Sequence, residues 1–382
     1  MKVGVDVRVL MDKYYSGVSE YTANLLKAIF ELDKEDSYKL FFNSFHDQSE
    51  RLGKWNKDNA ELVGLNIPNK IFNYIFQKTL SYPKLDKILG GVDVFWSPHF
   101  NFTKLSQDTK KVITVHDLSF LRYPEFFSAR KNFWHKSLGI KKTLLKADKI
   151  IAVSENTKND IVELLGINED KVQVIYSGNN VVKKEVKVED VQEFLAKKKI
   201  SGRMLLYLGT IEPRKNIINL IKAYNSLRKS GEEYNDVKLV LAGASGWKNR
   251  LTYREWQMSP YKNDIRFLGY VNQFEKDILY SQASLFVYPS FYEGFGFPPL
   301  EAMTYGIPVI SANVSSLPEV VSDAALMINP YEFTEICDAF KLVLNNEDLR
   351  NSLISKGLKR AEEFTWEKTA REYLDVFKKL SC

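Results

Sequence analysis

Short runs of apolar, β-forming residues alternate with longer helical patterns along the whole of this 382-residue chain. Helical periodicity occupies the intervals between the runs, for example at residues 19–32, 216–228 and 331–345. Strands separated by helices predict parallel sheets, because two parallel strands need a crossover connection. The runs expected to form strands are 2–9, 38–42, 92–96, 111–115, 149–153, 171–175, 204–208, 237–242, 265–267, 285–288, 308–310 and 325–328.

The alternation occurs twice, on either side of a charged stretch with little apolar pattern. We therefore expect an α/β fold with two doubly wound, Rossmann-like parallel-sheet domains at residues 1–180 and 201–364, joined by a linker at 181–200. The final segment, 365–382, has the pattern of an amphipathic helix. Two domains of this kind leave a cleft between them, and small-molecule sites favour such interfaces.

Composition excludes several classes of protein. Since the chain has no apolar run of about eighteen residues, no transmembrane helix is expected. Residues 1–9 have a strand pattern and not that of a signal peptide. The two cysteines, Cys337 and Cys382, give no disulfide framework, and with the four histidines they show no metal-ligand spacing. We therefore expect a cytoplasmic protein that needs no metal or other cofactor.

Positive charge is concentrated in residues 101–150, which hold 11 basic and 4 acidic residues. Within them, residues 129–146 mix basic and aromatic side chains at roughly helical spacing. One interpretation is a solvated helix with Phe133, Trp134 and Leu138 in the core. The other is a face that contacts an anionic membrane or a lipid-diphosphate acceptor. Nucleic acid is not expected as a partner, because no nucleic-acid-binding motif accompanies the charge.

The block at residues 290–310 places two carboxylates, Glu293 and Glu301, around a Gly-x-Gly turn and a Pro-Pro pair. It follows an expected strand, so it lies at the carboxyl end of that strand. Gly294 and Gly296 permit close backbone approach to a ligand, and the prolines suit the first turn of a helix. A pocket that holds hydroxyl groups and a pyrophosphate together needs this combination, at the edge where open α/β sheets bind ligands.

A second block, Gly209-Thr-Ile-Glu-Pro-Arg-Lys-Asn216, ends one strand and precedes a helix. Its adjacent cations Arg214 and Lys215 suit a diphosphate, because a helix amino terminus offers free N–H groups and partial positive charge. Arginine can bind phosphate through two parallel N–H bonds, and lysine adds a point charge. The alternative is that both cations merely pair with Glu212 on the surface.

Other expected strand ends carry further candidates. His116 and Asp117 follow one strand, where a histidine can bond a sugar hydroxyl or move a proton. His99 and Asn101 follow another strand in the same way, and a purely structural histidine is the alternative at both places. Gly17 lies in a loop after the first strand, where backbone N–H groups can approach a phosphate. The dinucleotide pattern Gly-x-Gly-x-x-Gly is absent there.

Taken together, these blocks resemble the retaining glycosyltransferase family 4, which has the two-domain GT-B fold with a cleft between the domains. The likeness covers nearly the whole chain, and residues 290–310 are its most specific part. The blocks at 209–216 and 315–320 strengthen it. The sequence is especially similar to bacterial mannosyl- and rhamnosyltransferases of O-antigen and exopolysaccharide assembly.

The resemblance implies roles for the donor-site residues. In the family, the first glutamate of the pair faces the donor sugar and the second binds the ribose, which here implies Glu293 and Glu301. Lys215 matches the phosphate-binding lysine, while Thr210 stands where the family usually has arginine, and Arg214 can supply the missing cation. The implied donor-binding residues are Gly17, Gly209, Thr210, Arg214, Lys215, Glu293, Gly294, Phe295, Gly296, Phe297 and Glu301.

The resemblance also implies that domain 1–180 binds the acceptor, that domain 201–364 binds the donor and that helix 365–382 packs back on the first domain. A metal-independent reaction with a GDP-sugar or a UDP- or dTDP-sugar follows from the same likeness. The residues implied in catalysis are His116, Glu293, Arg214 and Lys215. The residues expected to bind the acceptor are His99, Asn101 and Asp117.

The expected activity is that of a retaining hexosyltransferase in cell-surface polysaccharide synthesis. It would move mannose or a related hexose from a nucleotide-diphosphate sugar to a glycan or lipid-linked glycan, at the cytoplasmic face of a membrane. A front-face path and a double displacement through a carboxylate both remain open. The alternatives are a sugar-nucleotide epimerase on the same fold and a non-catalytic scaffold.

Overall fold

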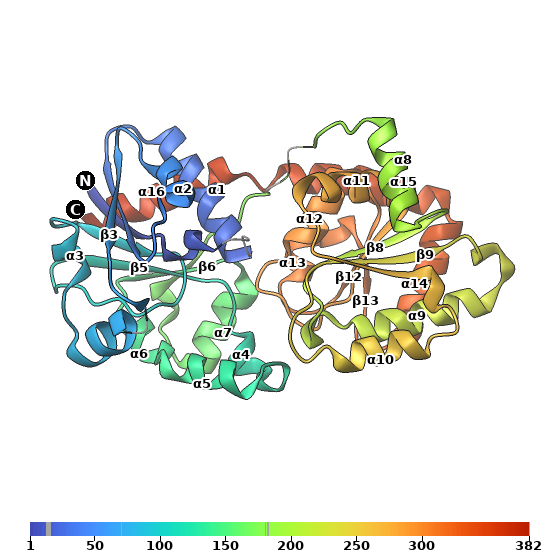
Figure 1. Ribbon diagram of the computed structural model, residues 1–382, viewed down its shortest axis with the longest axis horizontal. Helices are drawn as coiled ribbons and strands as arrows, with labels where there is room; N and C mark the ends of the chain where they lie inside the picture. The colour runs from blue at the N-terminus through green and yellow to red at the C-terminus, as the bar shows by residue number, and fades with distance from the viewer. Residues whose placement is uncertain (13–16, 70, 180, 182, 382) are drawn as a thin grey trace. The chain divides into compact units, whose positions relative to one another are not determined.

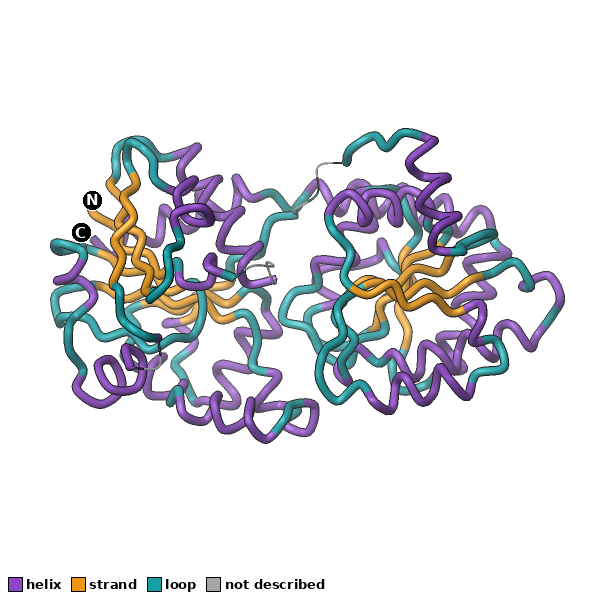
Figure 2. The backbone as a smooth tube through the Cα atoms, viewed as in Figure 1, coloured by secondary structure: helices purple, strands orange, loops and turns teal. Residues whose placement is uncertain are grey.

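A computed structural model describes residues 1–12, 17–69, 71–179, 181 and 183–381. The chain forms two compact units. The N-terminal unit consists of Met1–Leu118, Phe133–Gly178 and Thr365–Cys382, and the C-terminal unit consists of Ser119–Asn132 and Asn179–Phe364. In each unit a parallel sheet lies between layers of helices, which confirms the expected α/β class (Figures 1 and 2).

The sheet of the N-terminal unit has the strand order β3-β2-β1-β4-β5-β6-β7, and each neighbouring pair is parallel. Its strands are β1 (Lys2–Asp6), β2 (Ser37–Asn43), β3 (Ala60–Leu65), β4 (Val94–Ser97), β5 (Lys110–Val115), β6 (Lys149–Ala152) and β7 (Val172–Val174). Its helices are α1 (Gly17–Leu32), α2 (Ser49–Leu52), α3 (Leu85–Ile88), α6 (Ile140–Leu145), α7 (Glu155–Leu165) and α16 (Trp366–Ser381).

The sheet of the C-terminal unit has the order β10-β9-β8-β11-β12-β13 and is also parallel throughout. Its strands are β8 (Met204–Leu208), β9 (Lys238–Ala242), β10 (Ile265–Gly269), β11 (Leu285–Tyr288), β12 (Val309–Ala312) and β13 (Leu326–Ile328). Its helices are α4 (Ser119–Arg122), α8 (Val188–Lys198), α9 (Ile217–Ser230), α10 (Arg250–Met258), α11 (Gln273–Gln282), α12 (Phe297–Thr304), α13 (Leu317–Val321), α14 (Phe333–Asn345) and α15 (Glu347–Glu362).

Two elements of the first half differ from the expectation. The first strand ends at Asp6, because the next residues form a tight 3-10 turn at Arg8–Met11. The edge strand β3 was not expected, since Glu61 and Gly64 interrupt its apolar pattern. Pairing with β2 along its whole length makes Ala60–Leu65 a strand, which is an effect of tertiary structure that local sequence does not carry.

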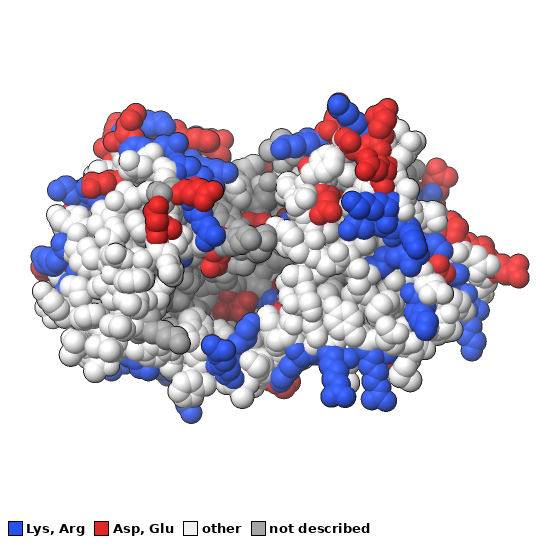
Figure 3. Space-filling model, viewed as in Figure 1, with Lys and Arg blue, Asp and Glu red and all other residues white. Residues whose placement is uncertain are grey.

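The structure of the basic segment, residues 129–146, contradicts one of the two interpretations given above. Gly139 takes a left-handed conformation, with φ of 57°, and separates α5 (Ala129–Ser137) from α6. Leu138 is buried as expected, but Phe133 is 73% exposed and Trp134 is 41% exposed. The prediction that these two aromatic side chains enter the core is therefore wrong. Figure 3 shows Lys and Arg side chains at the lower edge of the N-terminal unit, where Figure 1 places α5 and α6.

The segment between the two expected domains is not an irregular linker throughout. Residues Val188–Lys198 form α8, which belongs to the C-terminal unit. Phe194 is its buried side chain. A single buried anchor on an otherwise charged helix gives little apolar periodicity, which explains why the sequence pattern did not indicate this helix.

Strand order reverses beside the first strand of each sheet, between β1 and β4 and between β8 and β11. Loops that leave neighbouring strands in opposite directions open a crevice at the carboxyl ends, where open α/β sheets bind ligands. In the C-terminal unit two backbones touch there. A Cβ atom at Gly243, whose φ is 147°, would lie 2.0 Å from the carbonyl oxygen of Gly209. Glycine is therefore required at Gly243.

Helix α16 contributes to the core of the N-terminal unit beside α1 and β4 (Figure 1). The Tyr373 hydroxyl lies 2.8 Å from that of Tyr21 and 2.6 Å from that of Thr114. Trp96 donates a further hydrogen bond to Thr114 at 2.9 Å. All four residues are fully buried, so this network joins two helices and two strands where water cannot replace a lost partner.

We expect Tyr373→Phe to cost about 1 kcal/mol of unfolding free energy, because it removes one buried hydroxyl from the network. Tyr373→Ala should cost about 3–5 kcal/mol, since it also leaves a cavity. Urea unfolding followed by near-ultraviolet circular dichroism would measure both. Arg371→Ala, on the exposed face of the same helix, is the matched control and should change stability little. Equal effects of all three substitutions would contradict a core role for α16.

Candidate functional site

A buried ion pair lies at the end of β1 in the N-terminal unit, where the strand order reverses. Arg8 donates to the Asp6 carboxylate from Nε at 2.8 Å and from Nη2 at 2.6 Å. The guanidinium also donates to the Asn73 side chain at 2.9 Å and to the Phe102 carbonyl at 3.1 Å. Burial raises the pKa of Asp6, but the Arg8 cation outweighs it, so the net pKa is below its ordinary value. The guanidinium is thereby held in one orientation.

A cavity of about 400 Å³ opens beside this ion pair. His99 and Asn101, both expected to bind an acceptor, line it together with Arg8 and Asn73. The Nδ1 atom of His99 is buried and has no hydrogen-bond partner in the described part of the chain. Burial lowers the pKa of His99, so its ring is neutral at pH 7. The cavity therefore places neutral and amide groups beside the Arg8 cation, and the carboxyl group of Asp12 is also in its lining.

His116 is the first residue after β5. Its Nε2 atom lies 2.8 Å from the Pro98 carbonyl, and the Tyr21 ring packs edge-on against it with ring centroids 4.7 Å apart. Because a carbonyl only accepts, Nε2 carries the hydrogen and Nδ1 holds the lone pair. Burial lowers the pKa of His116 to about 4, although the Pro98 carbonyl opposes this. The ring is neutral at pH 7 and can accept a hydrogen bond through Nδ1.

A second buried ion pair occupies the corresponding place in the C-terminal unit. Lys215 lies in the turn after β8 and Glu293 in the loop after β11. The Lys215 ammonium contacts the Glu293 carboxylate and donates to the Tyr288 hydroxyl at 2.9 Å. Each of the two charged side chains is 8% exposed. The two loops are therefore joined by an ion pair that bulk water barely reaches.

Arg214 adds a second cation to this pair. Its Nε atom lies 3.1 Å from a Glu212 oxygen, and its Nη1 atom lies 4.0 Å from Glu293. Glu212 is only 3% exposed, so this is not the surface pairing considered from the sequence. Burial raises the pKa of Glu293, but Lys215 and Arg214 together hold it below its ordinary value. Glu293 is therefore ionised at neutral pH.

Lys131 is a third cation near the same group of charges. Its ammonium lies 3.1 Å from the centroid of the Trp247 ring, which is a cation–π contact. Burial lowers the pKa of Lys131, Glu212 opposes this and Arg214 adds to it, so all three charges act on one another. Three cations against two carboxylates leave this cluster with net positive charge. A bound anion would neutralise this net positive charge.

Two serines fix the backbone of the glycine loop after β11. Ser315 accepts a hydrogen bond from the Glu293 backbone at 2.9 Å. Ser316 contributes one hydroxyl to two carbonyls, that of Glu293 at 3.0 Å and that of Phe295 at 2.8 Å. Gly296 has a φ of 113° and is the last residue before α12. The loop is thus held in a conformation that brings its backbone close to the crevice.

Glu301 lies in α12 and is buried. The Tyr280 hydroxyl donates to one of its carboxylate oxygens at 2.8 Å. Burial, with Glu301 adding to it, raises the pKa of Tyr280 well above its ordinary value, so the hydroxyl stays a donor. The other oxygen of Glu301 accepts no hydrogen bond from the residues that the structure describes. That oxygen can accept one from a ligand hydroxyl.

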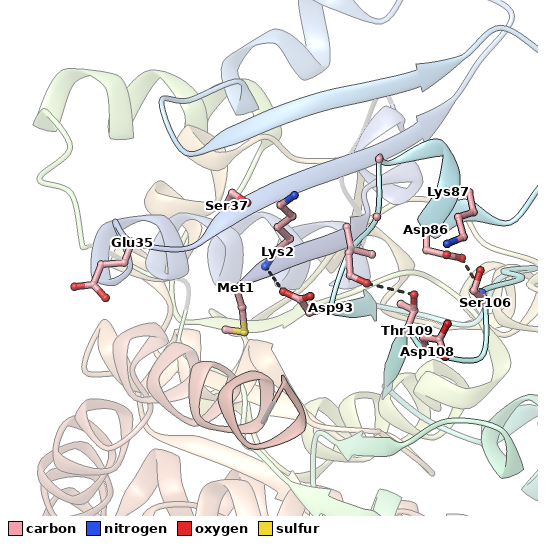
Figure 4. A pocket seen from close by; sticks show the side chains of 13 residues that line it. Met1, Lys2, Glu35, Ser37, Asp86, Lys87, Asp93, Ser106, Asp108 and Thr109 are labelled. Atoms are coloured by element: carbon pink, nitrogen blue, oxygen red, sulfur yellow. Dashed lines mark hydrogen bonds between the residues drawn. The ribbon is translucent and has the colours of Figure 1, made fainter.

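A larger cavity, of about 670 Å³, lies at the opposite edge of the N-terminal sheet, at the amino ends of its strands (Figure 4). Two of its carboxylates are used within the protein. Asp93 accepts from the Lys2 backbone at 2.7 Å and Asp86 from the Ser106 backbone at 2.8 Å, as Figure 4 shows. Since ligands of parallel α/β sheets bind at the carboxyl ends, this cavity is not the candidate site.

No group of three or more His, Cys, Asp or Glu side chains in the described ranges is placed to hold a metal ion. None of the described helices is both long and apolar enough to span a membrane.

Comparison with known proteins identifies the family. The family described as Glycosyltransferase Family 4 matches residues 44–182, and the family described as Glycosyl transferases group 1 matches residues 190–360. The chain is 34% identical over 382 residues to O-antigen chain mannosyltransferase B of Escherichia coli, with 96% of each chain covered. The chain belongs to glycosyltransferase family 4.

Other relatives of this glycosyltransferase agree with that assignment. It is 27% identical over 333 residues to O-antigen chain mannosyltransferase RfbU of Salmonella typhimurium, which covers 84% of this chain and 85% of the relative. The solved structure of Anabaena HepE in complex with UDP-glucose has a TM-score of 0.73 at 16% identity, with 99% of this chain and 100% of that chain covered. The structural likeness confirms the GT-B fold.

The predicted site residues of the glycosyltransferase fall into two groups, one at each strand-order reversal. The N-terminal unit holds His99, Asn101, His116 and Asp117. The C-terminal unit holds Gly209, Thr210, Arg214, Lys215, Glu293, Gly294, Phe295, Gly296, Phe297 and Glu301. Gly17 is the first residue of α1, and Tyr14, Tyr15 and Ser16 of its predicted loop lie outside the described residues.

Sequence reasoning missed several partners of these residues. Asp6 and Arg8 could have been found from the sequence, because they are charged residues within an otherwise apolar strand pattern. Lys131 could not have been found in this way, since the residues that it acts on, Glu212 and Arg214, are distant in sequence. Tyr280 and Tyr288 resembled ordinary core aromatics, and only their hydroxyl contacts distinguish them.

We expect Lys215→Met to lower the unfolding free energy of the glycosyltransferase by about 3–5 kcal/mol, because it leaves Glu293 buried without its main partner. The double variant Lys215→Met/Glu293→Gln should recover much of that loss. Urea unfolding of the wild type, both single variants and the double variant gives the coupling energy.

The contribution of the ionised Glu293 to stability has a defined pH window. Since the pKa of Glu293 is lower in the folded protein, its contribution is complete above about pH 4.5 and is lost as the pH falls through the folded value. Additive effects of the two substitutions, or a coupling energy unchanged down to pH 3, would contradict a buried ion pair.

Proposed function

We propose that this glycosyltransferase transfers mannose or a related hexose, with retention of configuration, from a nucleotide-diphosphate sugar to a glycan or lipid-linked glycan. The observation that carries the proposal is the buried Lys215–Glu293 pair beside Arg214, at the strand-order reversal of the C-terminal unit. Two similar proteins are O-antigen mannosyltransferases, and a structural neighbour was solved with UDP-glucose. These likenesses support the class of donor and acceptor.

The net positive cluster in the C-terminal unit suits the charge that the reaction creates. When the bond from sugar C1 to the phosphate oxygen breaks, the electron pair stays on the nucleoside diphosphate. Arg214, Lys215 and Lys131 stabilise that charge, in a site where preorganised cations act strongly. Glu293 and Glu301 present carboxylate oxygens to the hydroxyls of the sugar and the ribose. Because Glu293 is tied to Lys215, we propose that it works as a hydroxyl anchor and counter-charge.

The histidine side chains suit a neutral acceptor. With its pKa lowered to about 4, His116 is a hydrogen-bond acceptor at Nδ1 and not a general acid at neutral pH. We propose that it orients a hydroxyl of the sugar or the acceptor. The acceptor oxygen then bonds to C1 on the face that the diphosphate leaves, and its proton passes to the departing phosphate oxygen. This is the front-face path.

The donor site is tested by release of nucleoside diphosphate from a panel of GDP-, UDP- and dTDP-sugars in the presence of a lipid-linked oligosaccharide. Lys215→Ala and Glu293→Gln should each lower kcat/KM at least about 100-fold, since each removes an ionic or charge-assisted contact in the site. Glu362→Gln, at an exposed position on α15, is the matched control and should retain activity.

Two results would contradict the proposal. Release from no donor by folded wild-type protein would exclude a transferase of this kind. A changed sugar nucleotide formed without any acceptor would indicate the epimerase instead.

We further propose that the enzyme works at the cytoplasmic face of a membrane and contacts anionic lipid through residues 129–146. Phe133, Trp134 and Leu145 are exposed there, at 73%, 41% and 52%. Exposed basic side chains lie on the same two helices, namely Arg130, Lys136, Lys141, Lys142 and Lys146. Exposed aromatics among basic residues are typical of a peripheral membrane surface.

Sedimentation with phosphatidylglycerol vesicles tests this surface. Phe133→Ser/Trp134→Ser should weaken vesicle binding about tenfold, because two interfacial side chains are lost, and added salt should weaken the wild type as well. Leu342→Ser, at a position 47% exposed on α14, is the control. Binding that is unchanged by the double substitution would assign these aromatics another role.

A further inference from the structure

A second cavity of the N-terminal unit, of about 810 Å³, is lined by six lysines and one acidic residue. We call it the lysine pocket. It lies between the loop from β4 to β5, the end of the segment Ile71–Leu80, and α6 with the residues that precede it. Its charged lining residues are Lys78, Lys84, Lys104, Lys111, Lys142, Lys146 and Asp148.

The positive charge of the lysine pocket is not balanced within the protein. None of its six ammonium groups has a carboxylate at ion-pair distance in the part of the chain that the structure describes. Asp148, the acidic lining residue, accepts from the Lys111 backbone at 2.8 Å and lies 3.7 Å from Lys110, outside the lining. Folding has therefore brought like charges together without a counter-charge, which costs free energy unless an anion is bound.

Two lysines show the effect of this crowding. Lys111 is 9% exposed, and its ammonium is held by the Thr103 hydroxyl at 2.7 Å. Burial, and then Lys104, lower the pKa of Lys111 to about 8. Burial also lowers the pKa of Lys104, with Lys146, Lys84 and Lys142 adding to the effect. A bound anion would relieve the repulsion and restore full protonation of both side chains.

The surroundings of the lysine pocket indicate an amphiphilic anion. On one side the segment Ile71–Leu80 and the residues after it expose apolar side chains, namely Ile71, Tyr74, Ile75, Leu80 and Tyr82. The N-terminal unit is drawn largely in white around this segment in Figure 3. On the other side α5 and α6 expose Phe133, Trp134 and Leu145. Lysines inside a cavity whose neighbouring segments expose apolar side chains suit a phosphate ester of a lipid.

Asn101 connects this pocket to the candidate acceptor site. It lines both the lysine pocket and the cavity that contains Arg8 and His99. The two cavities are therefore neighbours in one unit. A single extended ligand can place a sugar in the cavity of His99 and an anionic group among the lysines.

We propose that the lysine pocket binds the phosphate or diphosphate group of a lipid-linked acceptor, apart from the donor site. This inference rests on the proposed function, because it assigns the acceptor of that reaction to a lipid phosphate. No bond is made or broken in the pocket. Its lysines hold the anionic end of the acceptor while the sugar end lies near His99.

Binding of inorganic pyrophosphate and of farnesyl diphosphate, measured by isothermal titration calorimetry, tests the pocket. Lys104→Gln/Lys142→Gln should weaken farnesyl diphosphate binding at least about tenfold, because two charge-assisted contacts are lost. Wild-type protein should bind one more pyrophosphate than the variant, since the donor site remains in both. Lys378→Gln/Lys379→Gln, which removes the same charge from exposed positions on α16, is the matched control.

Kinetics provide the second readout. The pocket variant should show a raised KM for a lipid-diphosphate-linked oligosaccharide, with an unchanged KM for the donor. It should show unchanged kinetics with the same oligosaccharide free of phosphate. Because neutralising two lysines relieves repulsion, the variant should be at least as stable as the wild type.

Several outcomes would overturn the inference. Equal binding of both diphosphates by wild type and variant would mean that the pocket holds no such anion. Loss of phosphatidylglycerol vesicle binding with retained farnesyl diphosphate binding would assign the lysines to membrane headgroups instead. The calorimetric test does not depend on turnover. Absence of activity with every donor would therefore reject the proposed function and leave the pocket itself testable.

Discussion

Parallel strand pairing is the constraint on which the whole site depends. Because neighbouring strands in each sheet run the same way, all their carboxyl ends meet at one edge, and the helices return the chain to the other edge. Residues that follow different strands thus become neighbours. Lys215 and Glu293 are far apart in sequence, yet each lies just beyond one of two adjacent strands, and their contact joins those loops.

The residues at the carboxyl ends of the two sheets differ in charge. In the N-terminal unit Asp6 and Arg8 neutralise each other, and burial keeps His99 and His116 neutral. In the C-terminal unit the cations around Lys215 outnumber the carboxylates. A neutral hydroxyl suits the first environment, and a diphosphate suits the second.

Much of this could be predicted from the sequence, because the relevant signals are local. The alternation of strands and helices indicated two parallel sheets. Glu293, Lys215 and His116 each lie in a segment that follows a strand, as their sequence positions indicated. What could not be predicted depends on tertiary contacts. Strand β3 exists through its pairing with β2, and Lys131 interacts with Glu212 and Arg214, which are distant in sequence.

The exposed aromatics show the limit of periodicity most clearly. Phe133 and Trp134 have the spacing of core residues, and the sequence alone left both interpretations open. Both lie in α5, which ends at Ser137 and has no buried side chain. The chain enters the core only beyond it, at Leu138 and Ile140, on either side of the turn at Gly139. Periodicity records which side chains share a helix face. It does not record whether anything covers that face.

The position of α16 has a consequence for how the protein is made. The core around Tyr373 joins the first helix of the chain to its last, so the N-terminal unit lacks part of its interior until that last helix has been synthesised. The C-terminal unit, by contrast, needs nothing beyond Phe364. During synthesis the usual order, in which the domain made first is completed first, is therefore reversed. Until α16 is made, the side chains of α1 and β4 that pack against it lack their partner.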